Sequence, residues 1–530
     1  MSFDPLLATT TLTLALEKGG LIVVAILAGA LLASTPARAA PRTRAAVVAA
    51  MLIATPALLA LALWNNHKLA TLHHHPLRGV AAVAAVLAVI GVLAHLINRH
   101  EQLLPLLGVG ALPFRIPLGS VSSGLLLPLY AVIAAGGLVF IVRNWNRAPE
   151  ARSEDPRFAR TLRSEGPVGS RRSRLPQLLA AVLVLYALQT TYSPDLGVVK
   201  AVENVGFFYV PFALLFFLLA RITWTAELLR RCLLVLLALA AVFVVVGLGE
   251  LADGSHLILN RGLDGDAYFV RINSLFYDPN VYGRFLALTM ILLSVVMLFE
   301  RRPRVLLAAA GGLAVMWVGL LLSLSQSSMA ALLVGLAVAA LATWGRRAAI
   351  VVSVVVVVGA GGAVAYALAS GNSASFLTSG RSSLVSGGLD LFKARPLLGY
   401  GSGSFSTEYK AHIPRRRNGF EIAKQLPFSA PTTSDSHTTP VTIAAEQGVV
   451  GLALYAVLLL ACFSELFGGD LLTRTDRTGW VARLAIAAAF TGLAVHTLFY
   501  ADFLEDPATW VLLAVGSALA GAASARPEPG

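Results

Sequence analysis

The stretch CLLVLLALAAVFVVVGLG, from Cys232 to Gly249, decides the fold, because it runs for 18 residues without a charged side chain. A helix of about 20 such residues spans the ~30 Å hydrocarbon layer of a membrane. Comparable runs cover residues 305–322 and 348–369. A water-soluble core cannot accommodate so many fully apolar helices. The sequence therefore predicts an all-α, polytopic integral membrane protein.

The rest of the chain repeats this pattern. Of its 530 residues, 57% are hydrophobic and 13% are charged. Hydropathy predicts about 12–14 transmembrane helices, at residues 19–36, 45–64, 79–97, 123–143, 176–192, 204–221, 229–250, 280–299, 305–323, 328–344, 349–369, 441–465, 481–500 and 508–524. The apolar run 103–113 is too short for a span, so we expect a re-entrant or broken helix there.

Basic residues predict which side of the membrane each connection occupies. The linker from Arg143 to Arg174 has nine arginines against four acidic residues, and further basic clusters occur at alternate connections after it. Cytoplasmic connections are rich in Lys and Arg. The connections between those clusters are therefore predicted to lie outside; they are 193–203, 251–278, 323–327, 370–440 and 501–507.

The same reasoning divides the chain into five regions. They are N-terminal transmembrane helices (1–143), a basic cytoplasmic linker (144–175), a central transmembrane region with an outer loop at 251–278 (176–369), a large outer loop (370–440) and C-terminal transmembrane helices (441–530). The topology of the first hundred residues stays open. Arg38, Arg42 and Arg44 favour the cytoplasm, but they fall outside unless residues 103–122 form an extra crossing.

Several function classes do not fit this sequence. The net charge of +13 is spread over short loops, whereas nucleic-acid binding needs a continuous basic face. The two cysteines lie in apolar runs and indicate neither a disulfide framework nor a thiol metal site. No phosphate-binding Gly-Lys-Ser/Thr loop is present, which argues against ATP-driven transport.

The long outer loop carries eight basic residues against four acidic ones. Because the positive-inside rule does not call for cations on that side, the charge indicates an anionic ligand. Attraction to anionic lipid headgroups is the alternative.

Two polar segments precede this loop. Arg271 lies just before the sequence FYDPN at 276–280, where Asp278 and Pro279 predict a helix start and Asn280 follows. An arginine near a membrane interface either snorkels or binds an anion. The turn SLSQSS at 323–328 includes Ser325 and Gln326, which either line a polar cavity or cap two helices.

The loop itself contains the densest set of candidate residues. Arg381 follows Gly380, and Arg395 precedes the glycine-rich turn PLLGYGSG at 396–403. His437 then stands just before the next span, which contains EQGVVG at 446–451. Arg416 belongs to a run of three arginines that either assists substrate binding or is simply solvated.

In this order, these motifs resemble the O-antigen ligase and O-antigen polymerase family of bacterial envelope glycosyltransferases. The resemblance covers roughly residues 204–507, and its specificity lies in the ordered set rather than in any single motif. It implies a multi-pass protein of the bacterial cytoplasmic (inner) membrane with its active site on the outer face. The implied reaction is an inverting, metal-independent transfer of a glycan from undecaprenyl pyrophosphate, without a cofactor. The acceptor is a glycolipid, a glycan or a protein.

The resemblance also implies residue roles. Arg271 and Arg381 match the arginines that contact pyrophosphate, and His437 matches the catalytic base. Many relatives have arginine where this chain has Gln326, so its donor contact there differs. The candidate substrate-binding set is Arg271, Arg381, Gln326, Ser325, Asn280, Arg395 and Arg416.

Other interpretations remain. A polymerase of the same family differs from a ligase only in its acceptor. A secondary transporter or lipid flippase is the alternative from another class, although ionisable residues are scarce within the spans from Asn280 onward. Asp264 and Asp266 resemble the paired acids of metal-dependent glycosyltransferases, but glycine between aspartates more often marks a turn.

Overall fold

The computed structural model describes residues 5–35, 40–63, 76–115, 125–145, 173–254, 271–345, 381–412, 435–468 and 477–524, together with 257, 347, 350–351, 354 and 471. Helices are the regular elements of this part of the chain, and no strand occurs in it. The prediction of an all-α fold is confirmed.

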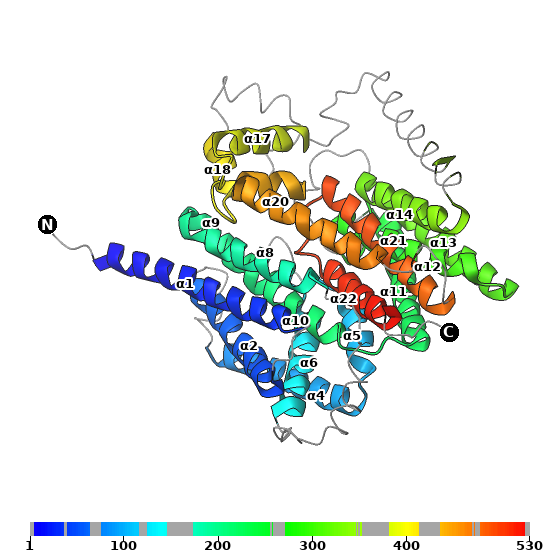
Figure 1. The fold of residues 1–530 in the computed structure, drawn as a ribbon, viewed down its shortest axis with the longest axis horizontal. Coiled ribbons are helices and arrows are strands. Elements are labelled where there is room, and N and C mark those ends of the chain that lie inside the picture. The colour runs from blue at the N-terminus through cyan, green and yellow to red at the C-terminus, as the bar shows by residue number, and fades with distance from the viewer. Residues whose placement is uncertain are drawn as a thin grey trace.

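The helices and their order along the chain are shown in Figure 1. Their bounds are α1 Pro5–Ala33, α2 Pro41–Leu63, α4 Pro76–Arg99, α5 Leu103–Ala111, α6 Leu127–Trp145, α8 Leu175–Gln189, η2 Thr190–Tyr192, α9 Asp195–Asn204, η3 Val205–Tyr209, α10 Val210–Leu219, α11 Ala226–Asp253, α12 Pro279–Phe299, α13 Pro303–Ser323, α14 Gln326–Trp344, α17 Arg381–Ala394, α18 Phe405–His412, α20 Thr439–Phe467, α21 Arg477–Phe499 and α22 Pro507–Ser524.

Within the described residues, 12 helices are long and apolar enough to cross a membrane, and α22 is a shorter apolar helix. The predicted span 349–369 lies almost wholly outside the described residues. On α4, the side chains of Val80, Val83 and Leu87 are both apolar and exposed. Helices that expose such side chains require a lipid environment. The chain is a multi-pass membrane protein.

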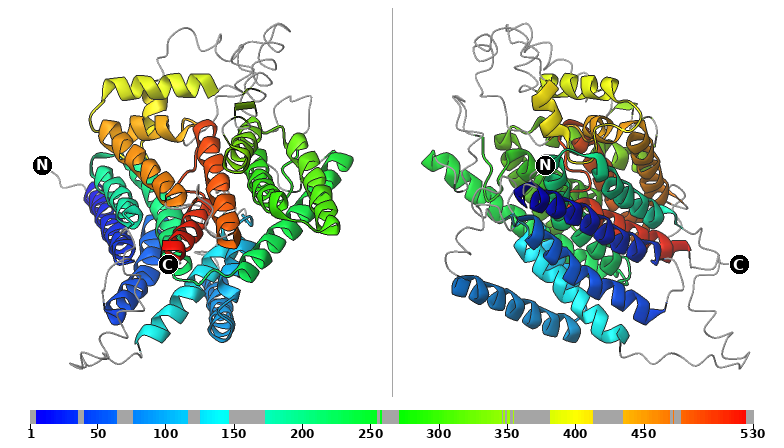
Figure 2. Two further views of the ribbon diagram at one scale, coloured as in Figure 1. Left: turned by 45° about the vertical axis from the view of Figure 1, so that its right-hand side comes forward. Right: turned by 90° about the vertical axis from the view of Figure 1, so that its left-hand side faces the viewer.

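The centre of the bundle is formed by α10 and α22. Phe216 of α10 and Trp510 of α22 are fully buried and meet edge to face, with ring centroids 6.5 Å apart. The helices α8, α20 and α21 surround this pair, and α12, α13 and α14 pack beyond α21 (Figure 2).

One boundary prediction was wrong. Residues 193–203 were expected to connect two spans, but α9 begins at Asp195 and continues through the π-helical turn η3 into α10 as one membrane-length segment. Lys200 and Glu203 lower the hydropathy of this stretch. Lys200 is accommodated because it lines a polar cavity inside the protein.

The structure settles the topology of the N-terminal third. Arg42 Nε donates to the Trp145 carbonyl over 3.3 Å, and Arg143 Nε donates to Asn98 Oδ1 over 2.9 Å. The beginning of α2 and the ends of α4 and α6 therefore share one end of the bundle, which we call the basic end. Since α4 and α6 both finish there, the chain crosses back between them. The short helix α5 starts that extra crossing, which places Arg42 with the other basic clusters.

The opposite end, which we call the site end, gathers the connections predicted to lie outside. There α17 lies across the bundle on α20, and α18 turns back beside it (Figures 1 and 2). Leu391, Tyr400, Phe405 and Ala445 form a small buried apolar cluster beneath them. The described part of the large loop is thus helical and has its own core.

Candidate functional site

Arg271 is tied to two other segments at the site end. Its Nε donates to the Ser323 carbonyl over 3.1 Å, and its Nη2 donates to Asn280 Oδ1 over 3.3 Å. The Ser325 hydroxyl donates to the same Asn280 oxygen over 3.0 Å. The structure therefore brings together three of the predicted site residues, which come from a loop, the start of α12 and the α13–α14 turn.

Two helix N-termini begin beside this guanidinium. Asp278 accepts from the Asn280 N–H over 2.6 Å and caps α12, while Ser325 caps α14 by accepting from the Ser328 N–H over 3.4 Å. The capping interpretation of both segments is correct, but it does not exclude a binding role. Helix N-termini carry partial positive charge. Gln326 opens α14 and its side chain is exposed.

The close approach of these segments depends on Gly283, which the sequence analysis missed. A Cβ at this position would lie 2.8 Å from Ser328 Oγ and 3.0 Å from both Ser323 Oγ and Ser325 Cβ. Only a residue without a side chain lets the serine turn pack this tightly on α12.

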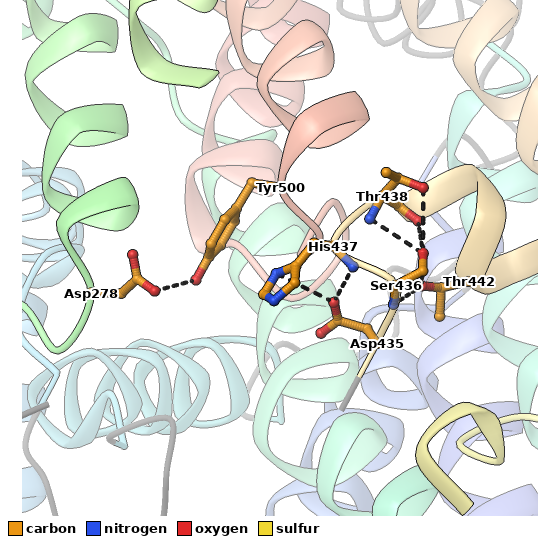
Figure 3. Close-up of polar contacts among 7 residues, drawn as sticks. All are labelled: Asp278, Asp435, Ser436, His437, Thr438, Thr442 and Tyr500. Carbon is orange, nitrogen blue, oxygen red and sulfur yellow. Dashed lines mark hydrogen bonds and ion pairs between the residues drawn. The ribbon is translucent and has the colours of Figure 1, made fainter. Parts of the chain in front are cut away.

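His437 occupies a strained loop just before α20. Its φ is +57°, in the left-handed region that non-glycine residues rarely adopt. The His437 N–H donates to Asp435 Oδ1 over 2.7 Å, and the imidazole Nδ1 lies 3.8 Å from the same oxygen (Figure 3). Ser436 fixes the turn, because its N–H donates to Thr442 Oγ1 over 3.0 Å. Such strain persists where the surroundings impose a conformation, as at functional sites.

His496 of α21 and Tyr500, which follows this helix, connect His437 to the residues around Arg271. The Tyr500 ring lies 5.8 Å from that of His437 and 5.6 Å from that of His496. The Tyr500 hydroxyl donates to Asp278 Oδ2 over 3.0 Å, as Figure 3 shows. His496 Nε2 in turn lies 3.2 Å from Ser327 Oγ. A continuous series of contacts, which we call the contact chain, therefore runs from Arg271 to His437.

A buried ion pair lies next to the contact chain. Arg284 of α12 is 2% exposed, and its Nη2 lies 2.6 Å from Asp506 Oδ2. Its guanidinium carbon is 5.8 Å from the Tyr500 ring centroid. The sequence analysis missed Arg284. Asp506 caps α22, by accepting from the Ala508 N–H, but it also neutralises an arginine in the membrane region.

The glycine-rich turn and the EQG motif interlock. Glu446 Oε2 accepts from the Gly403 N–H over 2.9 Å, and Oε1 accepts from the Phe405 N–H over 3.0 Å. A Cβ on Gly399 would lie 2.3 Å from the Glu446 carbonyl oxygen, and one on Gly448 would lie 2.3 Å from the Leu397 carbonyl oxygen. The two motifs occur together because they hold the large loop on the bundle.

The remaining predicted residues lie elsewhere or cannot be placed. Arg395 is exposed, with its guanidinium carbon 4.4 Å from the Tyr400 ring centroid, away from the contact chain. Arg381 is the first residue of α17, but its side chain lies outside the described residues. Arg416, Asp264 and Asp266 also lie outside them. Within the described residues, no group of three or more His, Cys, Asp or Glu side chains could hold a metal ion.

An apolar groove of about 1310 Å³ runs beside the site. It follows α12 from Val281 to Phe299 and ends at Arg284 and Asp506 toward the site end. Arg301 and Arg302 lie at its other mouth, at the basic end. Because α12 has 21 residues, the groove extends for roughly 30 Å, about the thickness of the hydrocarbon layer.

One protein-family model matches part of this chain. Residues 311–456 match the family model described as O-antigen ligase. The matched segment contains Ser325, Gln326, Arg381, Arg395 and His437, while Arg271 and Asn280 precede it. No curated protein shows significant similarity to the chain.

Proposed function

We propose that this chain moves a glycan from undecaprenyl pyrophosphate to an acceptor hydroxyl, and the match of residues 311–456 to the O-antigen ligase family model supports this proposal. The observation that carries the proposal is the contact chain, which joins Arg271 to His437 in one site. The reaction is inverting and uses neither a metal nor a cofactor. It takes place on the outer face of the bacterial cytoplasmic membrane.

The arginine side of the site suits the pyrophosphate. Arg271 supplies a fixed cation beside the N-termini of α12 and α14, and a planar guanidinium forms paired hydrogen bonds with phosphate oxygens. When the bond from the sugar C1 to the pyrophosphate oxygen breaks, negative charge develops on that leaving group. Preorganised donors at such a position are often the largest contribution to rate. Arg381 and Gln326 complete this binding role.

The apolar groove suits the lipid part of the donor. A polyprenyl chain needs a long apolar surface. The groove follows α12 from Phe299 to Val281, and Arg284 lies in its wall toward the site end. A chain lying in it would bring its pyrophosphate to the site end.

The histidine side suits activation of the acceptor. His437 removes the proton from the acceptor hydroxyl, whose oxygen attacks C1 on the face opposite the leaving pyrophosphate. Neutral imidazole is a suitable base near pH 7. The side chain is 29% exposed, so an acceptor can reach it from outside. A polymerase would use the same groups on a glycan acceptor.

The test is complementation of a strain that lacks the protein, read out as its envelope glycolipid profile on a gel. His437→Gln and Arg271→Ala should leave full-length glycans stranded on the lipid carrier, or single repeat units if the protein is a polymerase. The matched control is His412→Gln, because His412 lies on α18 and its Nε2 contacts the Tyr400 hydroxyl away from the contact chain. Normal glycolipids with His437→Gln would contradict the proposal. Transfer in membranes should also continue in excess chelator; its loss would point to Asp264 and Asp266.

A further inference from the structure

A small cavity with several ionisable groups in its lining adjoins Asp435, the residue bonded to the His437 backbone. Its volume is about 80 Å³, and its lining includes four carboxyl groups and one lysine. These are Asp435, Glu446, Asp502, Glu505 and Lys200. Asp435 is the link to the site, because it also accepts the backbone hydrogen bond of His437.

The cavity is built to hold water. Asn204, which lines it, is 6% exposed; its Nδ2 donates to the Tyr186 hydroxyl, but within the described residues its Oδ1 has no partner. A buried acceptor of this kind requires a donor. A single water needs roughly 10–15 Å³ of such space, so several fit.

The charges around the cavity do not balance. The titratable groups that face it come from every surrounding element; they are Tyr186 of α8, Lys200 of α9, Tyr209 of η3, Glu446 and Tyr455 of α20, Asp435 before α20, and Asp502 and Glu505 after α21. Carboxylates that share a buried site cannot all be ionised beside one cation. Burial, together with the neighbouring Asp502, raises the pKa of Glu505 well above its ordinary value.

The four carboxyl groups are not equivalent. Both oxygens of Glu446 accept backbone N–H bonds from the glycine-rich turn, so this carboxyl group holds the large loop in place. Asp435 is bonded to the His437 backbone and lies nearest to the imidazole. Asp502 and Glu505 lie together on the α21–α22 turn and are the groups left to take up a proton.

We propose that this cavity receives the proton that His437 removes from the acceptor, with Asp435 as the positioning residue between the imidazole and the cavity. The inference rests on the proposed function. His437 Nε2 takes the proton from the acceptor hydroxyl, and the Nδ1 proton passes to Asp435. It continues through cavity water to the Asp502–Glu505 pair. Two protons move, one onto Nε2 and one off Nδ1, and no electron is transferred. The imidazole left behind is neutral but protonated on Nε2; it is reset for the next turnover when the cavity returns a proton to Nδ1 and Nε2 releases its proton to solvent.

The test is the rate of glycan transfer against pH in membranes that supply their own donor and acceptor. Asp435→Asn keeps an oxygen that accepts the His437 N–H and removes only the charge. Glu505→Gln changes the far end of the route. Each variant should slow transfer by about tenfold or more at neutral pH. In Asp435→Asn the acidic limb of the profile should also move to lower pH, because this variant removes a negative charge 3.8 Å from the imidazole.

The matched control is Glu203→Gln. Glu203 lies on α9 with Lys200 but does not line the cavity, so its rate and profile should equal those of the wild type. Protein amounts in the membrane are measured for every variant. Wild-type rates and profiles in both Asp435→Asn and Glu505→Gln, with His437→Gln inactive, would overturn the relay and leave the proposed function intact. A slower rate of Asp435→Asn without a shift in the acidic limb would also overturn the relay, since a structural defect gives that result. Activity in His437→Gln would overturn the proposed function instead.

Discussion

The two halves of the candidate site are held in different ways. On the Arg271 side, hydrogen bonds join three segments. Gly283 has no side chain and so allows the serine turn to pack closely on α12. On the His437 side, the imidazole is held by a strained backbone and a neighbouring ring, with its Nδ1 still 3.8 Å from Asp435. The arginine half is organised in advance, as charge stabilisation requires. The histidine half has room to tighten when an acceptor arrives.

The largest effect is expected from removing the fixed charge. Arg271→Ala should lower the transfer rate by about 10²–10³-fold, because no other described side chain reproduces its position beside two helix N-termini. Arg271→Lys should recover only part of the activity, since an ammonium cannot form the paired contacts of a guanidinium. The measurement is the initial rate of glycan transfer in membranes. Arg231→Ala, at the basic end where Arg231 pairs with Glu227, serves as control and should behave as wild type.

A smaller effect should follow from loosening the same half. Gly283→Ala places a methyl group against the serine turn and should cost about 1–3 kcal/mol of folding free energy. It should also lower the rate by about tenfold or more through displacement of Ser325 and Arg271. Thermal unfolding and the transfer rate measure the two effects. Gly312→Ala is the control, because a Cβ there would meet only Leu293 at 3.8 Å; equal results for both variants would mean that the close packing is unimportant.

Weakening the link between the halves should matter less. Tyr500→Phe keeps the ring beside His437 but removes the hydrogen bond to Asp278, at a cost of about 1 kcal/mol, or roughly fivefold in rate. The comparison is Tyr192→Phe, which removes a 2.8 Å hydrogen bond to the Leu398 carbonyl outside the contact chain. If the two variants have the same rate, the halves are not coupled through Tyr500.

The smallest effect concerns stability against pH. Because the pKa of Glu505 is raised by burial and by Asp502, the folded state binds a proton that the unfolded state releases. The stabilisation is complete below the ordinary pKa of 4.5 and is lost as pH rises through the raised value. The Tm in detergent should therefore fall as the pH rises above about 4.5. Glu505→Gln should flatten this slope and Glu203→Gln should leave it; a wild-type slope with Glu505→Gln would contradict the pKa shift.

The sequence predicted the fold well because membrane thickness sets the length of each helix, and composition alone shows it. It failed where polar residues lie inside the protein. Lys200 interrupted the hydropathy of α9, although its side chain faces a cavity. The N-terminal topology needed the contacts of Arg42 and Arg143, which no local pattern reveals.

The site was predicted in part for a similar reason. Arg271, Asn280, Ser325 and His437 stood out because polar groups at helix starts are conspicuous between apolar runs. Tyr500 and Arg284 did not, since each is ordinary in its own segment. Their importance comes from partners more than 200 residues away, as with the 222 residues that separate Tyr500 from Asp278. Asp278 was read as a helix start, and it is a cap of α12 as well as a member of the contact chain.

The most direct test separates binding by the arginine half from turnover by the histidine half. Each variant would be purified from a strain lacking the wild-type protein, and the lipid-pyrophosphate glycan that co-purifies with it would be quantified. His437→Gln should retain the lipid-linked glycan in a stalled complex, whereas Arg271→Ala should retain little, with comparable amounts of folded protein. Equal retention by both variants, or retention by Arg271→Ala alone, would contradict the division of the site into a donor-binding half and a base.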